Sequence, residues 1–134
     1  MKKVAIPEKM QKFYGIGTML HPDIEMVESV IKEIPVGKVA TIDSVCKRLA
    51  RDHDTDVTCP MRTTNFVKTI TEIHSAQDEP IPFWRVVRKN HMLINSNFTI
   101  LCAENLGKEG FKLLKNRKGE FQVQNLEDRL FTFS

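Results

Sequence analysis

The sequence predicts a mostly helical α+β fold that contains a helix-turn-helix and ends in a β-hairpin. Apolar residues recur at helical spacing in three successive segments between residues 22 and 74, and alternating apolar residues flank a polar turn at residues 116–119. The chain has 134 residues, of which 41% are hydrophobic and 28% are charged. Because this length supports one sizeable core and is short for two, we expect residues 1–134 to form a single domain.

The first helix should begin near Pro22. Proline suits a first helical turn, and the acidic residues Asp23 and Glu25 suit its positive end. The helix should stop just before Pro35, because proline cannot continue it. Its apolar stripe consists of Ile24, Val27, Val30 and Ile31. Residues 1–20 precede it without sustained periodicity, and we expect them to be irregular with room for a short strand.

A second helix should follow a short extended link at Val39. Thr41 is a suitable N-cap for it. The positions that should face the core recur at helical spacing and are Ile42, Val45, Cys46, Leu49 and Ala50. Cys46 is therefore expected to be a core residue. The polar segment 51–59 that follows has no periodicity and predicts a loop.

A third helix should have Thr58 as its cap and Pro60 in its first turn, and should continue to about His74. Its apolar side consists of Phe66, Val67, Ile70 and Ile73, and its polar arc of Asn65, Lys68, Thr69 and Glu72 with Arg62 at the border. Two consecutive amphipathic helices, the second with a polar outer face, have the outline of a helix-turn-helix, although the connection here is long. Small helical domains of other functions show the same pattern.

A fourth helix is expected over residues 99–110 and should be closed by Gly110. A hairpin should follow, turning at residues 116–119 and pairing two apolar sets: Phe111 and Leu113 with Phe121 and Val123. A hairpin after a three-helix unit would serve as a wing. The tail at residues 125–134 either packs on the core or forms a partner surface, through Leu126, Leu130, Phe131 and Phe133.

The cysteines and acidic residues predict neither a disulfide nor a metal or cofactor site. Cys46, Cys59 and Cys102 are odd in number and unrelated in spacing. His53 lies in an acidic segment, but no second cluster completes a metal shell. Cys59 is the best candidate for a reactive thiol, because it stands at the start of the third helix, where the helix dipole lowers a thiol pKa.

The charge of the chain is compatible with a polyanionic partner. The net charge is +3 and the isoelectric point is near 8.8, although a solvated surface alone would account for both. No apolar run approaches the roughly 20 residues that span a bilayer, and the N-terminus "MKKVAIPEKMQKF" lacks the apolar core of a secretory signal. We therefore expect a cytoplasmic protein without membrane contact.

Four stretches in this order resemble one protein family: "IPVGKVATIDSVCKRLA", then Arg62 opening a helix, then "IPFWRVV", then "NLGKEGF". They are similar to the DNA-binding and active-site domain of O6-alkylguanine DNA alkyltransferases, and closest to the alkyltransferase-like proteins that lack the nucleophilic cysteine. In that family the stretches read IPxGxVxTYxxxA, an Arg followed by AVGxA, PCHRV or PWHRV, and LLxxEG. The resemblance covers about residues 24–113, so that residues 1–20 and 125–134 are peripheral to it.

The resemblance implies a winged-helix-like fold whose second helix of the helix-turn-helix enters the minor groove of double-stranded DNA. It implies that Arg62 replaces a guanine rotated out of the stack, and that the polar face of this helix, through Asn65, Lys68 and Thr69, contacts DNA. The lesion pocket that it implies consists of Ile42, Pro82, Phe83, Trp84 and Arg85. In true alkyltransferases a cysteine accepts the alkyl group, whereas in the alkyltransferase-like proteins a tryptophan replaces it and lesions are bound without repair.

Several positions depart from the family pattern. Phe83 stands at the nucleophile position, where a phenyl ring cannot accept an alkyl group, and Trp84 stands where the family has its activating histidine. The sequence therefore predicts that the protein is not an enzyme. The family has a tyrosine at the position of Ile42 and an asparagine at the position of Thr71. The resemblance implies that these two family residues take part in base flipping. Glu109 matches the family glutamate and, without a histidine to orient, is expected to cap or pair locally.

These observations leave three hypotheses. The first is a non-catalytic protein that recognises O6-alkylguanine or distorted DNA in support of repair, with a repair protein as a further partner. The second is a diverged winged-helix module for general DNA or protein binding, in which Phe83 and Trp84 are core residues. The third, which the sequence favours least, is an active methylated-DNA cysteine methyltransferase that uses another thiol, such as Cys59.

Overall fold

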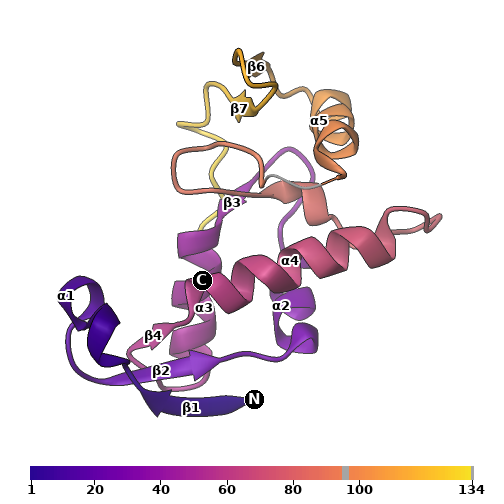
Figure 1. The fold of residues 1–134 in the computed structure, drawn as a ribbon. Coiled ribbons are helices and arrows are strands. Elements are labelled where there is room, and N and C mark those ends of the chain that lie inside the picture. Colours follow the sequence, from indigo (N-terminus) through magenta and orange to yellow (C-terminus); the bar gives the residue numbers. More distant parts are fainter. Residues whose placement is uncertain (95–96, 134) are drawn as a thin grey trace.

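Three mutually packed helices occupy the centre of the molecule (Figure 1). They are α2 (Ile24–Ile31), α3 (Ile42–Asp52) and α4 (Pro60–His74). The fold is a computed structural model that describes residues 1–94 and 97–133. With a further helix and small sheets around this centre, the predicted mostly helical α+β class is confirmed.

The starts of α2 and α3 agree with the capping signals. Asp23 is the N-cap residue of α2, and the Thr41 side chain accepts a hydrogen bond of 3.2 Å from the Ser44 backbone N–H at the start of α3. The predicted core set of α3, Cys46 included, is buried. The end of α2 differs from the prediction, because the helix stops at Ile31 and turns occupy the residues before Pro35.

The third predicted helix, α4, differs from the sequence prediction at its cap and on its buried face. Cys59 and not Thr58 precedes Pro60 as the cap residue, because the Thr58 hydroxyl donates to the Cys46 carbonyl at 2.8 Å and so belongs to the contact with α3. Ile73, predicted on the apolar side, is 52% exposed. The buried face of α4 instead includes two threonines, Thr63 and Thr71. Their hydroxyls donate to backbone carbonyls one turn earlier, Thr63 to Cys59 and Thr71 to Val67.

A three-stranded sheet packs against α3 and leads into α4, so that residues 1–20 contain two strands where the sequence predicted an irregular segment with room for one short strand. The strands are β1 (Lys2–Ala5), β2 (Thr18–His21) and β4 (Val57–Thr58), in the order β1-β2-β4. The β1–β2 pair is antiparallel and the β2–β4 pair is parallel. The prediction of a loop over residues 51–59 is thus partly wrong, because β4 lies within this segment. Its partner strand, β2, is far away in the sequence.

Two short helical elements join β1 to β2. They are a 3-10 turn, η1 (Glu8–Met10), and the single turn α1 (Gln11–Tyr14). Both lie at the edge of the sheet, on the same side of the molecule as β4 (Figure 1).

The C-terminal half adds a second core beside the three helices. Its elements are the 3-10 turn η2 (Phe83–Arg85), β5 (Val86–Val87) and α5 (Thr99–Lys108), and β5 pairs in parallel with β3 (Ala40–Thr41) from the N-terminal half. Gly110 has φ +87° just after α5, as its predicted role in ending the helix requires. The second core consists of Val39, Val87, Leu93, Leu106, Phe111, Val123 and Leu126.

The predicted hairpin and the tail are both part of this arrangement. The strands β6 (Leu113–Lys115) and β7 (Phe121–Val123) pair antiparallel with Leu113 opposite Val123, which confirms the hairpin. The tail then runs beside Val39, which donates to the Arg129 carbonyl at 3.0 Å and accepts from the Phe131 N–H at 2.7 Å. Phe133 is buried in the first core, so the tail packs on the domain.

None of the helices within the described residues is long and apolar enough to cross a membrane.

Candidate nucleic-acid interface

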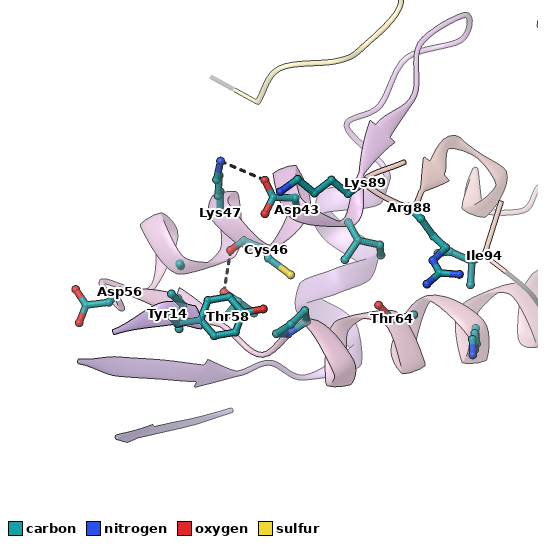
Figure 2. A pocket seen from close by; sticks show the side chains of 15 residues that line it. Tyr14, Asp43, Cys46, Lys47, Asp56, Thr58, Thr64, Arg88, Lys89 and Ile94 are labelled. Atoms are coloured by element: carbon teal, nitrogen blue, oxygen red, sulfur yellow. Dashed lines mark hydrogen bonds and ion pairs between the residues drawn. The ribbon is translucent and has the colours of Figure 1, made fainter. Parts of the chain in front are cut away.

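A groove with a volume of about 600 Å³ lies between α3 and α4 (Figure 2). The α4 side is formed by Pro60, Thr64 and Lys68, which are four residues apart and therefore follow one another along a single stripe of the helix. Ile42 and Cys46 line the α3 side. The volume is within the range of roughly 300 to 1,000 Å³ that is typical of small-molecule sites in proteins.

The two ends of the groove are formed by different parts of the chain. Tyr14 and Asp56 lie at one end and Arg88 and Ile94 at the other, with Lys89 beside α3 (Figure 2). Tyr14 comes from α1, in a segment where the sequence showed no periodicity. Arg88 and Lys89 follow β5 directly. These positions were not predicted, because no motif marks them in the sequence and only the fold brings them to the groove.

The charges along the groove favour an anionic ligand. Lys68, Arg88 and Lys89 are exposed, and none of them forms an ion pair with a residue that the structure describes. The acidic groups are engaged elsewhere: Asp43 pairs with Lys47 at 3.2 Å, and Asp56 accepts hydrogen bonds from the backbone and hydroxyl of Thr18. The cations are therefore available to a phosphate or carboxylate from outside.

The residues predicted to bind DNA occupy the outer surface of α4. Arg62, Asn65, Lys68 and Thr69 are all exposed. Lys68 faces the groove, whereas Arg62 is six residues away and points about 120° around the helix from it. Arg62 lies on the side of β2. There desolvation, followed by the positive charges of Arg62 and Lys2, lowers the pKa of His21.

The residues of the predicted lesion pocket are divided between two places. Ile42 lines the groove. Phe83 is only 2% exposed and belongs to the first core, with Trp84 packed edge-on against it at 5.1 Å between ring centroids. The cavity beside these two rings holds only about 10 Å³, which is too small for a nucleobase. Ile94 borders both this cavity and the groove.

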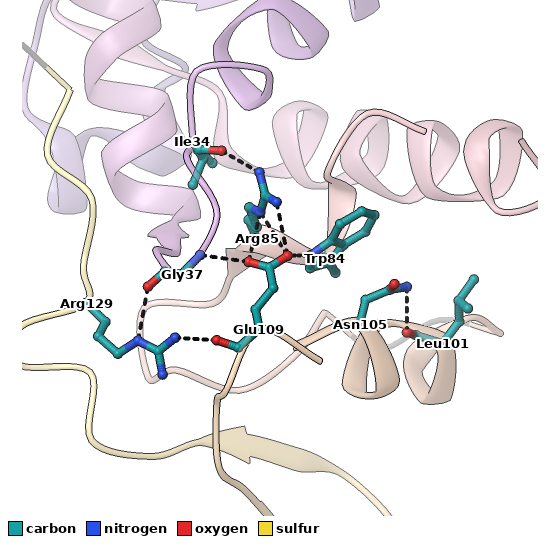
Figure 3. A network of polar contacts seen from close by, with 8 residues as sticks. All are labelled: Ile34, Gly37, Trp84, Arg85, Leu101, Asn105, Glu109 and Arg129. Atoms are coloured by element: carbon teal, nitrogen blue, oxygen red, sulfur yellow. Dashed lines mark hydrogen bonds and ion pairs between the residues drawn. The ribbon is translucent and has the colours of Figure 1, made fainter. Parts of the chain in front are cut away.

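Trp84 and Arg85 are held by the carboxylate of Glu109 (Figure 3). The Trp84 indole N–H donates to Glu109, the Arg85 Nε donates to it at 3.1 Å, and the backbone N–H of Gly37 donates to it at 2.9 Å. Arg85 also donates to the Ile34 carbonyl at 2.7 Å. Glu109 is the cap residue at the end of α5, as expected, but its carboxylate pairs with distant segments, which corrects the expectation of local pairing.

The electrostatics of Glu109 follow from these contacts. Burial would raise its pKa, but the hydrogen bonds from Arg85, Gly37 and Trp84 together lower the pKa below its ordinary value. The side chains of Arg85 and Glu109 are 11% and 9% exposed. Arg129 extends the network by donating to the backbone carbonyls of Glu109 and Gly37 at 2.7 and 3.0 Å. The "IPFWRVV" segment is thus anchored to the residues around Gly37.

The cysteines are poorly suited to alkyl transfer. Burial raises the pKa of Cys46 to about 11 and that of Cys102 to about 12, so both thiols are protonated at neutral pH. Cys59 is buried at the start of α4. Within the described residues, no group of histidine, cysteine and acidic side chains could hold a metal ion.

Two solved structures have a similar fold. One is Schizosaccharomyces pombe Atl1 in complex with damaged DNA containing O6-carboxymethylguanine, with a TM-score of 0.62 and 18% identity over 82% of this chain and 94% of that one. The other is S. pombe ATL in complex with DNA, with a TM-score of 0.57 and 20% identity over the same shares. At these identities the similarity concerns the fold, and at that level the predicted alkyltransferase-like architecture is confirmed.

No protein-family model matches the chain, and no curated protein matches it in sequence. The resemblance found in the short motifs is thus supported by the fold and not by overall sequence similarity.

Proposed function

We propose that this protein binds double-stranded DNA through α4 and the adjoining groove, and that it recognises alkylated or distorted DNA without chemical repair. The observation that carries the proposal is the groove itself, with Lys68, Arg88 and Lys89 available along an opening of about 600 Å³. Phosphate contacts supply most of the affinity of DNA-binding proteins, and such cations provide them. The fold shared with two structures that contain DNA supports the same conclusion.

The outer face of α4 provides the remaining DNA contacts in this proposal. Arg62 is exposed in the first turn, where a guanidinium reaches a base step or a phosphate. Asn65 and Thr69 lie on the same outer face. The groove receives the extruded base, and Ile42 and Ile94 provide its apolar contacts. In this arrangement the Phe83–Trp84 pair lies behind the groove and supports it.

Alkyl transfer is not part of the proposal. The motif resemblance puts the phenyl ring of Phe83 at the nucleophile position, and this ring cannot accept an alkyl group. Trp84 donates its N–H to Glu109 and cannot act as a base that activates a water molecule. The intact mass of the protein should stay unchanged after incubation with alkylated DNA. An added alkyl group on any cysteine would contradict this part.

Affinity for matched duplexes tests the proposal. Fluorescence anisotropy should show tighter binding to a duplex with one O6-methylguanine than to the same duplex with guanine, at equal moderate salt. Equal affinity for the two duplexes would refute lesion recognition, and general DNA binding would remain as the function.

A second candidate function is a diverged module for general DNA or protein binding. It is favoured by the burial of Phe83 and by the small cavity of about 10 Å³ beside it. Arg62→Ala separates the two candidates. If the protein recognises lesions, this variant should lose the preference for the modified duplex. If the second candidate is correct, the variant and the wild type should bind with the same affinity.

A further inference from the structure

The groove differs in character between its two ends. Arg88 lies at one end, with Lys89 toward the same side, whereas Tyr14 provides an aromatic ring at the opposite end (Figure 2). Lys68 lines the groove from α4, and Lys47, nearer to Tyr14 (Figure 2), is paired with Asp43. Tyr14 is the only tyrosine of the chain and the only aromatic residue that lines the groove within the described residues. A nucleotide offers the matching pair of surfaces, an anionic phosphate and a flat π-face.

Tyr14 is available to a ligand. It is 42% exposed, and its hydroxyl has no hydrogen-bond partner among the described residues. Its ring is 6.4 Å from that of Phe13, at an angle of 60°. Phe13 itself does not line the groove, is 72% exposed, and lies 5.0 Å from the ammonium group of Lys12. The two neighbouring rings therefore have different surroundings.

The turn that carries Tyr14 is fixed to the sheet. The Ile6 N–H donates to the Gly17 carbonyl at 2.9 Å, the Gly15 N–H donates to the Gln11 carbonyl at 2.7 Å, and the Gln11 side chain donates to the Ile6 carbonyl at 3.2 Å. These bonds close the segment between β1 and β2 into a compact loop. Its conformation is therefore set before any ligand arrives.

The loop is also placed relative to α4. Gly17 lies so close to Asp56 that an added Cβ would be 2.3 Å from Asp56 Oδ2, and Asp56 accepts a bond of 2.8 Å from the Thr18 N–H. Asp56 directly precedes β4, and β4 leads through Cys59 into α4. The position of Tyr14 is thus linked through a few bonded residues to the helix proposed to enter DNA.

We propose that Tyr14 is a nucleotide-contacting residue: its ring stacks on a base or sugar of the DNA strand whose phosphates bind Lys68, Arg88 and Lys89. The N-terminal loop thereby extends the DNA interface beyond the region that resembles the alkyltransferase family. This inference rests on the proposed DNA binding, but not on the preference for a lesion.

The matched variants are Tyr14→Ala, Tyr14→Phe and Phe13→Ala, each compared with wild type on duplexes with and without O6-methylguanine. Loss of one base–aromatic stack should weaken binding of Tyr14→Ala by about 5-fold to 100-fold. Tyr14→Phe keeps the ring and should stay within about 2-fold of wild type. Phe13→Ala should be unchanged, because its ring does not line the groove. Thermal unfolding of each variant serves to show that the fold is retained.

A spectroscopic measurement tests the contact without any substitution. Protein labelled only at tyrosine gives ring signals from a single residue, and stacking on a base should shift them upfield when either duplex is added. Unshifted signals at saturation, or an affinity of Tyr14→Ala equal to that of wild type, would overturn the inference. Equal losses in Tyr14→Ala and Phe13→Ala would overturn it as well.

The outcomes also separate this inference from the proposed function. If wild type prefers the lesion and Tyr14→Ala binds like wild type, only the role of Tyr14 fails. If wild type has no preference but Tyr14→Ala weakens both duplexes, lesion recognition fails and the contact stands. A wild-type protein that binds neither duplex would refute both.

Discussion

Trp84, which the motif resemblance would align with a histidine, connects several parts of the site. Its indole N–H donates to Glu109, while its ring packs on Phe83 and lies 5.4 Å from the guanidinium of Arg85. A side chain with an N–H donor and a large apolar surface thus serves as a structural link. Since indole cannot accept a proton at neutral pH, Trp84 itself cannot act as a general base.

Replacing the carboxylate at this link should destabilise the fold. Glu109→Gln keeps the size of the side chain but leaves the nearly buried Arg85 without a counter-charge. We expect the free energy of unfolding to fall by about 1.5 to 3 kcal/mol, as measured by urea denaturation at pH 7. Trp84→Phe removes the N–H donor and part of the ring but keeps the Arg85–Glu109 ion pair, and should cost about 1 kcal/mol for the lost hydrogen bond in addition to the lost ring contact. Equal stability of Glu109→Gln and wild type would show that the network contributes nothing.

The same carboxylate should make stability depend on pH. Its pKa in the folded protein lies below the ordinary value of 4.5, so its stabilising contribution is complete above that value. The contribution is lost as the pH falls through the folded-state pKa. The difference in unfolding free energy between wild type and Glu109→Gln should therefore shrink toward zero in acid. A difference that is constant from pH 7 to pH 3 would contradict the assigned ionisation.

At the scale of elements, the connection between α3 and α4 is ordered by β2, a strand that precedes both helices in the sequence. The β2–β4 pair places Leu20 opposite Thr58, and the Cys59 N–H donates to the Leu20 carbonyl at 2.9 Å. Together with the Thr58 hydroxyl bond to α3, these contacts fix the residues from which α4 begins. A long helix-turn-helix connection thereby acquires a defined geometry.

Crowding the contact between Gly17 and Asp56 should loosen this connection. Gly17→Ala forces the Asp56 side chain to move and disturbs its bonds to Thr18. We expect a loss of about 1 to 3 kcal/mol in stability, with faster hydrogen exchange at the amides of residues 56–59. The control is Gly107→Ala in α5, where nothing lies within 4 Å of the added Cβ. It should stabilise the protein by up to about 1 kcal/mol. Unchanged exchange in Gly17→Ala would count against the role of the sheet.

At the scale of the whole molecule, the sequence predicted the elements that carry their own periodic signal. The helices α2 to α5 and the β6–β7 hairpin were found within a few residues, because apolar spacing and glycine turns mark them locally. The strands β1, β2 and β4 were not located: the sequence left room for one short strand in residues 1–20, and β4 lies where a loop was expected. They have two to four residues each, and the pairing of Leu20 with Thr58 leaves no local pattern.

The candidate site was predictable only in part for the same reason. Ile42 and Lys68 were identified from motif and helix face, whereas Tyr14, Arg88 and Lys89 reach the groove through the fold alone. The burial of Phe83 was also not decided by the sequence, since an apolar ring fits a lesion pocket and a core equally well.

The groove cations should determine the salt dependence of DNA binding. Each phosphate contact contributes about one unit to the slope of log affinity against log salt concentration. Lys68→Ala should therefore weaken binding to all duplexes and reduce the slope by about one unit. The control Lys118→Ala, in the turn between β6 and β7, should leave the slope unchanged. A slope that is the same in Lys68→Ala and wild type would place the phosphate contacts elsewhere.

An amide NMR titration with a duplex that contains O6-methylguanine is the sharpest test of DNA binding along α4 and the groove. We expect the shifted amides to cluster at α1, the first turns of α4 and residues 88–94, with small changes in the β6–β7 turn. Shifts that spare these segments, or that are confined to the β6–β7 hairpin, would contradict it.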